Sequence, residues 1–297
     1  MRIVKSLCIY EWKSWDGFLL PMMFPGATRV RARLGETSAD LLKRIPSYAG
    51  SFAFHVNLTD TRRTPLRRAA FCRALRARGI RILNEQVTDI SKHRVQEVCT
   101  QAGLGSTRAA RAGDPDEVLI VKTNANYGGE KEKFLSADQR RLLGLGPRCR
   151  WIRRHDGYLI RRRSEVRPEF WRSRQVIVER FIENRGHVFY RAHKVMDRVI
   201  ISRMVNPAGI KKMLQQIRRT NWYLHLPALE PIEGPRPMPM HVARAVSRFC
   251  AAGRLDVGSI DVLEDDDGEC HVIDINASPF WGEAGYDHML RFLAGGL

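Results

Sequence analysis

Residues 118–129 read VLIVKTNANYGG. The apolar start of this stretch predicts a buried strand. Lys122 stands at the end of that strand, and a polar loop with Gly128 and Gly129 follows at once. Such a lysine can neutralise phosphate oxygens, and a glycine loop can bring backbone N–H groups close to a phosphate chain. The loop is not a Walker loop, because GxxxxGK[ST] is absent. By itself the stretch only favours nucleotide binding, and other segments have to support it.

A second set of polar residues lies on two short apolar segments, GSIDV at 258–262 and VIDINASP at 272–279. Side chains alternate along a strand, so Asp274 and Asn276 are expected on one face, with Asp261 on the partner strand of an acidic hairpin. Three oxygen ligands of this kind suit Mg²⁺. The alternative is an ordinary hairpin with a wet polar face, but the apolar neighbours predict a buried strand whose polar groups need a partner.

A third segment, VIVERFIE at 176–183, is an apolar strand that carries Glu179 and runs into a turn with Glu183. The edge of such a strand can offer backbone groups to an adenine. The carboxylate that follows can accept hydrogen bonds from ribose hydroxyls.

The first 88 residues alternate between strand and helix patterns. Strands are expected at 2–10, 51–58 and 80–83, with a helix that Thr64-Pro65 opens and Gly79 closes. A small open α/β domain follows from this order. A second helix begins at Asp89 or Ser91. Beyond it we expect strands at 117–122, 175–182, 187–195 and 198–205, a proline-rich connection at 227–239, and a helix at 240–252.

The composition, with 44% hydrophobic and 28% charged residues, is that of a folded protein. No uninterrupted apolar stretch could span a membrane, and residues 1–6 lack the apolar core of a signal peptide, so a cytoplasmic protein without a membrane partner is expected. The six cysteines stand singly without a zinc-binding spacing, which predicts reduced packing residues.

The chain is strongly basic, with 50 basic and 32 acidic residues and a net charge of +18. Its densest run, residues 148–174, interleaves arginines with Trp151, Tyr158, Phe170 and Trp171. Such a run could bind a nucleic acid, an acidic peptide or a phosphorylated substrate. The alternative, a solvated face of an arginine-rich protein, is favoured because no nucleic-acid-binding motif accompanies the run.

In this order, the segments resemble those of the ATP-grasp superfamily, which includes D-alanine:D-alanine ligase, glutathione synthetase and a ribosomal-protein glutamate ligase. The resemblance covers about residues 80–297. It includes a first segment that matches Asn84, Lys92 and the turn at Gly103, although Gly105 and Ser106 stand where proline is common. The implied fold class is α/β (α+β), an ATP-grasp domain at 89–297 after a pre-ATP-grasp open α/β domain at 1–88. The ATP-grasp domain would divide into 89–182, with the phosphate loop, and 183–297, with the metal site.

The resemblance also implies roles for individual residues. Lys92 and Lys122 would bind the α and β phosphates, and Asp261, Asp274 and Asn276 would bind magnesium, with Asp274 where a glutamate is more usual. Several members place an arginine two residues before the first metal acid, but Ser259 stands there, so Arg191 and Arg203 are our candidates for the catalytic phosphate or carboxylate contact. The remaining expected nucleotide contacts are Tyr127, Gly128 and Gly129 in the phosphate loop, Glu179, Arg180, Phe181 and Ile182 in the adenine hinge, and Glu183 at the ribose.

The implied reaction is ATP-dependent joining of a carboxylate and an amine through an acyl phosphate, with ATP and one or two Mg²⁺, or Mn²⁺, as cofactors. The carboxylate could be a small molecule or a peptide, an acidic or phosphorylated substrate would suit the basic surface, and a homodimer is expected. Aromatic residues at 12–25 and 280–283 are expected either to line the substrate pocket or to belong to the core. Lys122→Ala should lose nearly all ATP turnover while folding normally.

Two other functions remain open at this point. An ATP-grasp kinase would use the same nucleotide site to phosphorylate a small-molecule hydroxyl. A non-catalytic basic protein could bind ATP or nucleic acid without turnover, although such a protein has no need of a metal set.

Overall fold

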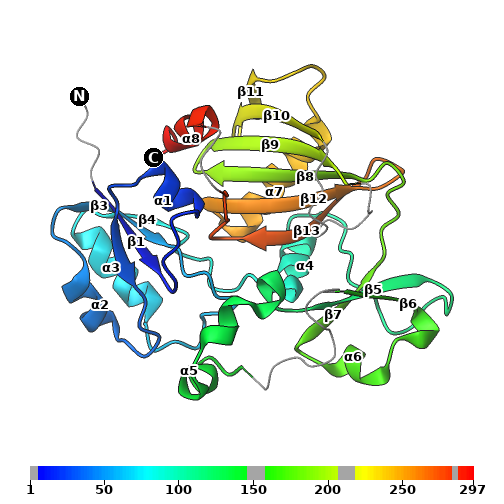
Figure 1. The fold of residues 1–297 in the computed structure, drawn as a ribbon, viewed down its shortest axis with the longest axis horizontal. Coiled ribbons are helices and arrows are strands. Elements are labelled where there is room, and N and C mark those ends of the chain that lie inside the picture. The colour runs from blue at the N-terminus through cyan, green and yellow to red at the C-terminus, as the bar shows by residue number, and fades with distance from the viewer. Residues whose placement is uncertain (1–5, 146–157, 207–217, 283–286) are drawn as a thin grey trace.

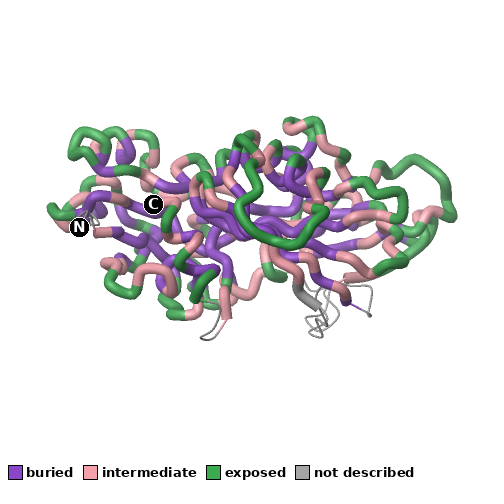
Figure 2. Tube along the Cα trace, turned by 90° about the horizontal axis from the view of Figure 1, so that it is seen from above, coloured by how far each residue is buried: buried purple, intermediate pink, exposed green. Residues whose placement is uncertain are grey.

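The computed structural model describes residues 6–145, 158–206, 218–282 and 287–297, which form three sheets with helices around them (Figure 1). Buried residues follow the strands of the sheets, and exposed residues gather in the loops and on the outer sides of the helices (Figure 2). Among the described residues, no helix is long and apolar enough to cross a membrane.

The N-terminal sheet is parallel, in the order β2-β1-β3-β4. Its strands are β1 (Ser6–Glu11), β2 (Thr28–Arg31), β3 (Ala49–Phe54) and β4 (Arg81–Leu83). Helices α2 (Ser38–Arg44) and α3 (Arg68–Ala77) pack on one face, and α1 (Leu19–Met23) packs on the other. The predicted open α/β arrangement is therefore confirmed, although β2, α1 and α2 were not expected from the sequence.

The smallest sheet is antiparallel, in the order β6-β5-β7. It consists of β5 (Val118–Thr123), β6 (Tyr158–Arg162) and β7 (Val176–Arg180). Leu119 and Val121 of β5 pack against Val176 and Val178 of β7 and against Phe170. The short elements beside this sheet are η1 (Asn126–Gly129), η2 (Lys131–Phe134), α5 (Ala137–Leu142), η3 (Arg163–Glu165) and α6 (Pro168–Arg172).

The largest sheet has the order β11-β10-β9-β8-β12-β13, with antiparallel neighbours throughout. Its strands are β8 (Val188–Val195), β9 (Arg198–Val205), β10 (Arg218–His225), β11 (Glu230–Glu233), β12 (Val257–Glu264) and β13 (Cys270–Asn276). Helices α4 (Lys92–Gln101) and α7 (Met240–Gly253) bury one face, and α8 (Asp287–Ala294) covers part of the other. The predicted connection at 227–239 contains β11, where Pro231 is tolerated because β11 is an edge strand.

The described part of the basic run, residues 158–174, is largely engaged in structure. Arg162 pairs with Asp116 at 3.1 Å, and Arg163 pairs with Glu117 and donates to the Asp114 carbonyl at 3.0 Å. Residues 148–157 lie outside the described residues. The five described cysteines are free, and burial raises the pKa of each thiol to about 12, which suits packing residues.

Candidate active site

One face of the large sheet carries a row of charged side chains. Asp261 of β12 stands opposite Asp274 of β13 on one side and opposite Arg191 of β8 on the other. The Arg191 guanidinium donates to both Asp261 carboxylate oxygens, from Nε at 2.8 Å and from Nη2 at 3.1 Å. Like charges that face each other across a strand pair are destabilising unless they are compensated, and Arg191 supplies part of that compensation.

A β-bulge sets the direction of Asp274. Asp261 pairs with Asp274 but the next residue, Val262, pairs with Val272, so Ile273 is an extra residue on β13. Val272 points into the core shared with α4 and α7, whereas Ile273 packs on the opposite face. Bulges re-aim side chains beside functional sites. Here the bulge lets β13 bury Val272 and still present Asp274 and Asn276 to the charged face.

Lys92 reaches this face from α4. Its Nζ lies 3.1 Å from Asp274 Oδ1, and its side chain is buried. Helix α4 packs on the other side of β13 through Val95 and Cys99, but β13 is an edge strand, so the first residue of the helix can reach around the edge. The predicted phosphate-binding lysine and a predicted metal ligand therefore meet, although they are far apart in the sequence.

Lys122 is held by a buried carboxylate. Its ammonium group pairs with Glu179, which is 1% exposed and also accepts a hydrogen bond from Thr107 Oγ1 at 2.6 Å. Lys122 and Glu179 come from neighbouring strands of the smallest sheet. Glu179, predicted in the adenine hinge, thus acts in this structure as the partner of the second lysine.

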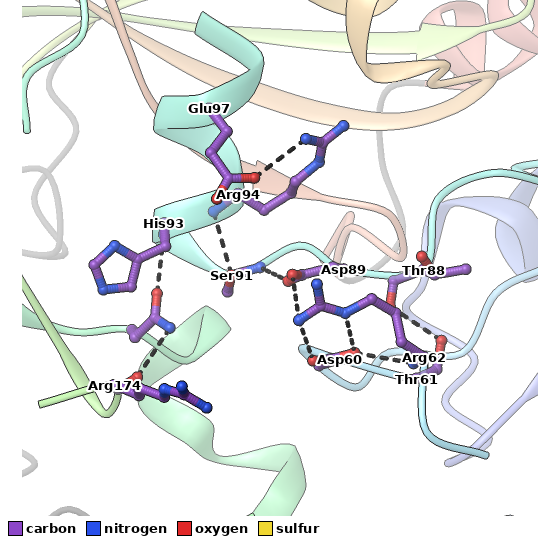
Figure 3. Close-up of polar contacts among 11 residues, drawn as sticks. Asp60, Thr61, Arg62, Thr88, Asp89, Ser91, His93, Arg94, Glu97 and Arg174 are labelled. Atoms are coloured by element: carbon purple, nitrogen blue, oxygen red, sulfur yellow. Dashed lines mark hydrogen bonds and ion pairs between the residues drawn. The ribbon is translucent and has the colours of Figure 1, made fainter. Parts of the chain in front are cut away.

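Asn124 connects the two lysine-bearing elements. Its backbone carbonyl accepts from Lys92 N at 3.1 Å and its Oδ1 accepts from His93 N at 2.9 Å, so it caps the first turn of α4. Its Nδ2 donates to the Arg174 carbonyl at 3.1 Å beside β7 (Figure 3). Ser91 caps the same helix by accepting from Arg94 N at 3.3 Å. Asn124 follows Lys122 by two residues, so one amide fixes α4 to the end of β5.

Tyr158 lies near two acids of the site, Asp274 and Glu179. It stands opposite Lys122 on β6, and burial, Asp274 and Glu179 together raise its pKa. The acid of β13 and the acid that holds Lys122 therefore both act on this phenol, so the charged edge of the smallest sheet lies near the charged face of the largest one.

The predicted phosphate loop folds as η1. Tyr127, Gly128 and Gly129 all have positive φ, of 47°, 65° and 76°. This conformation is easy for glycine but strained for Tyr127, which is exposed. Asn126 N donates to Thr59 Oγ1 at 2.9 Å, which ties the loop to the N-terminal domain. Successive amides in such a turn can form an anion-binding concavity.

Two solved structures are similar to this chain in fold. An ADP complex of the N5-carboxyaminoimidazole ribonucleotide synthetase purK matches 93% of this chain and 70% of its own, with a TM-score of 0.51 and 9% sequence identity. An ATP-grasp protein with a RimK domain, from Sphaerobacter thermophilus, matches 98% of this chain and 99% of its own, with a TM-score of 0.50 and 10% identity. The chain has the ATP-grasp fold. No family model and no curated protein sequence matches it.

Within the ATP-grasp fold, the two candidate arginines lie on opposite faces of the large sheet. Arg191 stands opposite Ser202, so the next residue on β9, Arg203, points the other way. Arg203 lies beside Tyr190 on the side of α7, where burial and a hydrogen bond to Glu264 raise the pKa of the Tyr190 phenol. The structure therefore brings Arg191, but not Arg203, to Asp261. Burial lowers the pKa of Arg191, while the charge of Asp274 opposes this effect.

The residues of the predicted adenine hinge have different surroundings up to the end of β7 and beyond it. The backbone of β7 is paired on both sides, with β5 and with residues 107–109, as far as Phe181, whose N–H donates to Val118 O at 3.1 Å. Ile182 packs against Phe189, Met204 and Leu263, which form an apolar patch on the face that carries Arg191 and Asp261. Glu183, the expected ribose acid, is exposed and lies 3.6 Å from Arg185.

The donor set suits a magnesium ion that shares its coordination with a nucleotide. Asp261 and Asp274 face each other, and Asn276 follows on the same face, opposite Ser259. Asn276 Oδ1 accepts from Ser278 N at 3.0 Å, which fixes the amide and leaves one lone pair on that oxygen. Among the described residues, no three His, Cys, Asp or Glu gather as a metal site. Two carboxylates and an amide are nevertheless what magnesium needs when phosphates complete its shell.

Several residues of this site were not expected from the sequence. Thr107, Asn124 and Tyr158 owe their positions to contacts between distant segments, and so does Thr59 beside the loop. Only Asn124 carried a local signal, since it stands two residues after the strand lysine. The patch of Phe189, Met204 and Leu263 reads in sequence as ordinary core.

Proposed function

We propose that this protein is an Mg²⁺- and ATP-dependent ligase that joins a carboxylate to an amine through an acyl phosphate. The proposal depends on one observation above all, the contact of 3.1 Å between Lys92 Nζ and Asp274 Oδ1. That contact supports the proposal because it joins the lysine expected to bind phosphate to an acid expected to bind magnesium. The ADP bound in the similar purK structure supports the use of ATP, which the fold alone does not establish.

In this proposal, each part of the site has one role. The apolar patch at Ile182 takes the adenine, while Lys92, Lys122 and the amides of the Asn126–Gly129 loop bind the phosphates. Asp261, Asp274 and Asn276 would hold magnesium, which supplies positive charge to the phosphate oxygens when it is bound. Arg191, which already donates to Asp261 from Nε and Nη2, would bind the transferring phosphoryl group through its remaining N–H donors.

The proposed chemistry has two steps. A carboxylate oxygen of the substrate attacks the γ-phosphorus of ATP, and the β–γ bridging oxygen leaves with its electron pair as part of ADP. The amine nitrogen then attacks the acyl carbon, phosphate leaves, and the amine loses a proton. Preorganised positive groups stabilise the charge that develops on the phosphoryl group, and each such contact is worth roughly 3 kcal/mol.

The test is a phosphate-release assay with candidate acids, including amino acids and peptides, in the presence and absence of hydroxylamine. Hydroxylamine traps an acyl phosphate as a hydroxamate, so this product supports the ligase and also identifies the acid. A phosphorylated product that forms without any amine and gives no hydroxamate would instead identify a kinase. Salt-dependent RNA binding without ADP release would identify a non-catalytic binding protein.

A pair of matched variants tests the assignment of Arg191. Arg191→Met should reduce kcat at least about a hundredfold, because a donor preorganised for the transition state is lost. Arg203→Met removes the same charge from the opposite face of the same sheet and should change kcat much less. Equal effects of the two substitutions would contradict the assignment.

A further inference from the structure

Two aromatic segments from opposite ends of the chain pack together beside the proposed site. Phe18 and Phe280 form an antiparallel bridge, and Trp281 N donates to Gly17 O at 2.7 Å. The rings of Trp15 and Phe280 lie 4.8 Å apart, yet the two residues are 47% and 44% exposed. A Cβ on Gly17 would lie 2.5 Å from the Phe280 ring, so the absence of a side chain there allows this approach. Glu283, the end of the second predicted segment, lies outside the described residues.

This aromatic pair borders the face that carries the proposed metal ligands. Phe280 follows Asn276 by four residues. The ring of the next residue, Trp281, lies 4.8 Å from the ring of His193. His193 stands opposite Ser259, which in turn stands opposite Asn276. A molecule bound against Trp15 and Phe280 would therefore lie next to the reaction site.

Two lysines lie against the rings of this region. Lys131 Nζ is 4.8 Å from the centre of the Trp15 ring and 4.9 Å from that of Phe18, and Lys13 Nζ is 4.2 Å from the centre of the Phe134 ring. Burial and the charge of Lys13 lower the pKa of Lys131, so the two ammonium groups repel each other. The rings compensate part of this charge through their negative faces.

Neither lysine has a carboxylate within 4 Å in the part of the chain that the structure describes, because the acids nearby have other partners. Asp16 pairs with Arg29, and Glu130 pairs with Lys133. Glu132 is buried and accepts from Thr59 N at 2.7 Å. Glu132 and Glu130 offset part of the charge of Lys131 from a distance, but neither forms an ion pair with it among the described residues. Two neighbouring cations attract an anion more strongly than either does alone.

We propose that Lys13, Lys131, Trp15 and Phe280 form a binding site for a dianionic group attached to an aromatic or apolar one. The dianion is either a phosphate monoester or a pair of neighbouring carboxylates. This inference rests on the proposed function, since it assigns the site to the substrate that the ligase activates or joins. The two lysines bind the charges, and the exposed rings stack on the flat or apolar part next to them.

The test measures the affinity of four small probes at constant ionic strength by titration calorimetry. Benzyl alcohol, benzoate, phthalate and phenyl phosphate share a ring and differ in charge. We expect the dianions phthalate and phenyl phosphate to bind at least about tenfold more tightly than benzoate, and benzyl alcohol to bind weakest, because each charge-assisted hydrogen bond is worth about a factor of ten or more. The tighter of the two dianions identifies which source of charge the site prefers.

Three variants separate this site from the general basic charge of the chain. Lys13→Ala and Lys131→Met should each raise the Kd of phenyl phosphate and phthalate about tenfold. Lys131→Met keeps an apolar stem on the Trp15 and Phe18 rings and so protects the fold. Lys43→Ala removes the same charge from the last turn of α2 and should change the Kd less than about twofold, in line with the small effect of a distant, screened charge.

Two results would overturn the site. One is equal affinity for benzoate and the two dianions, and the other is an equal loss of affinity in Lys43→Ala and Lys131→Met. Failure of the proposed function looks different, because ADP titration and the hydroxamate assay report on it separately. Tight dianion binding without ATP turnover would support the binding site and contradict the ligase function. A hydroxamate from an acid whose binding is unchanged in the Lys13 and Lys131 variants would support the ligase and rule out the dianion site.

Discussion

Replacement of Lys122 should destabilise the protein as well as abolish ATP turnover. From the sequence, Lys122→Ala was expected to lose ATP turnover and to fold normally. In the structure, Lys122 is instead the ion-pair partner of Glu179, which is 1% exposed. The substitution leaves that carboxylate with the Thr107 hydroxyl at 2.6 Å as its side-chain hydrogen-bond donor.

The size of the effect follows from the burial of the pair. Removal of one partner of a buried ion pair costs about 3–5 kcal/mol, whereas replacement of both partners by neutral groups of similar shape is often nearly neutral. Lys122→Ala should therefore lower the free energy of unfolding by about 3–5 kcal/mol, a large part of the 5–15 kcal/mol that is typical of a native protein. The double variant Lys122→Met/Glu179→Gln should recover most of this loss.

The assay is urea unfolding followed by tryptophan fluorescence, with ATP binding measured on the same samples. Both variants should fail to bind ATP tightly, but only the single variant should be strongly destabilised. Equal stability of Lys122→Ala and the wild-type protein would refute the reasoning about the buried pair. A double variant that is no more stable than the single one would refute it as well.

Three further predictions concern the cap, the bulge and a buried histidine. Asn124→Ala removes the side-chain cap of α4 and should cost about 1 kcal/mol of unfolding free energy while raising the KM for ATP, and unchanged values of both would contradict the role of Asn124. Deletion of Ile273 removes the extra residue of the bulge and leaves Val272 in the core and Asp274 on the charged face, so Mg²⁺-dependent turnover should survive in the phosphate-release assay, whereas Asp274→Ala should abolish it. Burial lowers the pKa of His55, which is fully buried, so the unfolded state takes up a proton first as the pH falls through about 6.5. Unfolding free energy should thus decrease below that pH in the wild-type protein, and equal pH profiles of wild type and His55→Gln would exclude this histidine as the cause.

The sequence predicted those features of the site that depend on local pattern. Strand periodicity predicts the apolar run that ends in Lys122. Periodicity together with a turn predicts the hairpin that pairs Asp261 with Asp274. Arg191 and Arg203 show the limit of this reasoning. Which face a residue takes depends on the register between β8 and β9, and one residue of shift reverses it. That register is set by the two-residue turn at Met196 and Asp197, which pairs Val195 with Arg198.

The elements that were missed have a related cause. β10 begins with Arg218 and Arg219 and is a strand because β9 and β11 pair with it. β2 has only four residues and gains its hydrogen bonds from β1. Thr107 and Tyr158 likewise join the site only once the sheets have formed. Tertiary contacts decided these positions over local preference.

The cap at Asn124 has a consequence for motion in this molecule. The Asn124 side chain that caps α4 comes from the end of β5. A rotation of the three-stranded sheet would therefore displace the first turn of α4, which packs against the six-stranded sheet. An independent swing of the three-stranded sheet would break this cap. Any movement of the three-stranded sheet relative to the six-stranded one therefore has to carry Lys92 with it or break the hydrogen bond from His93 N to Asn124 Oδ1.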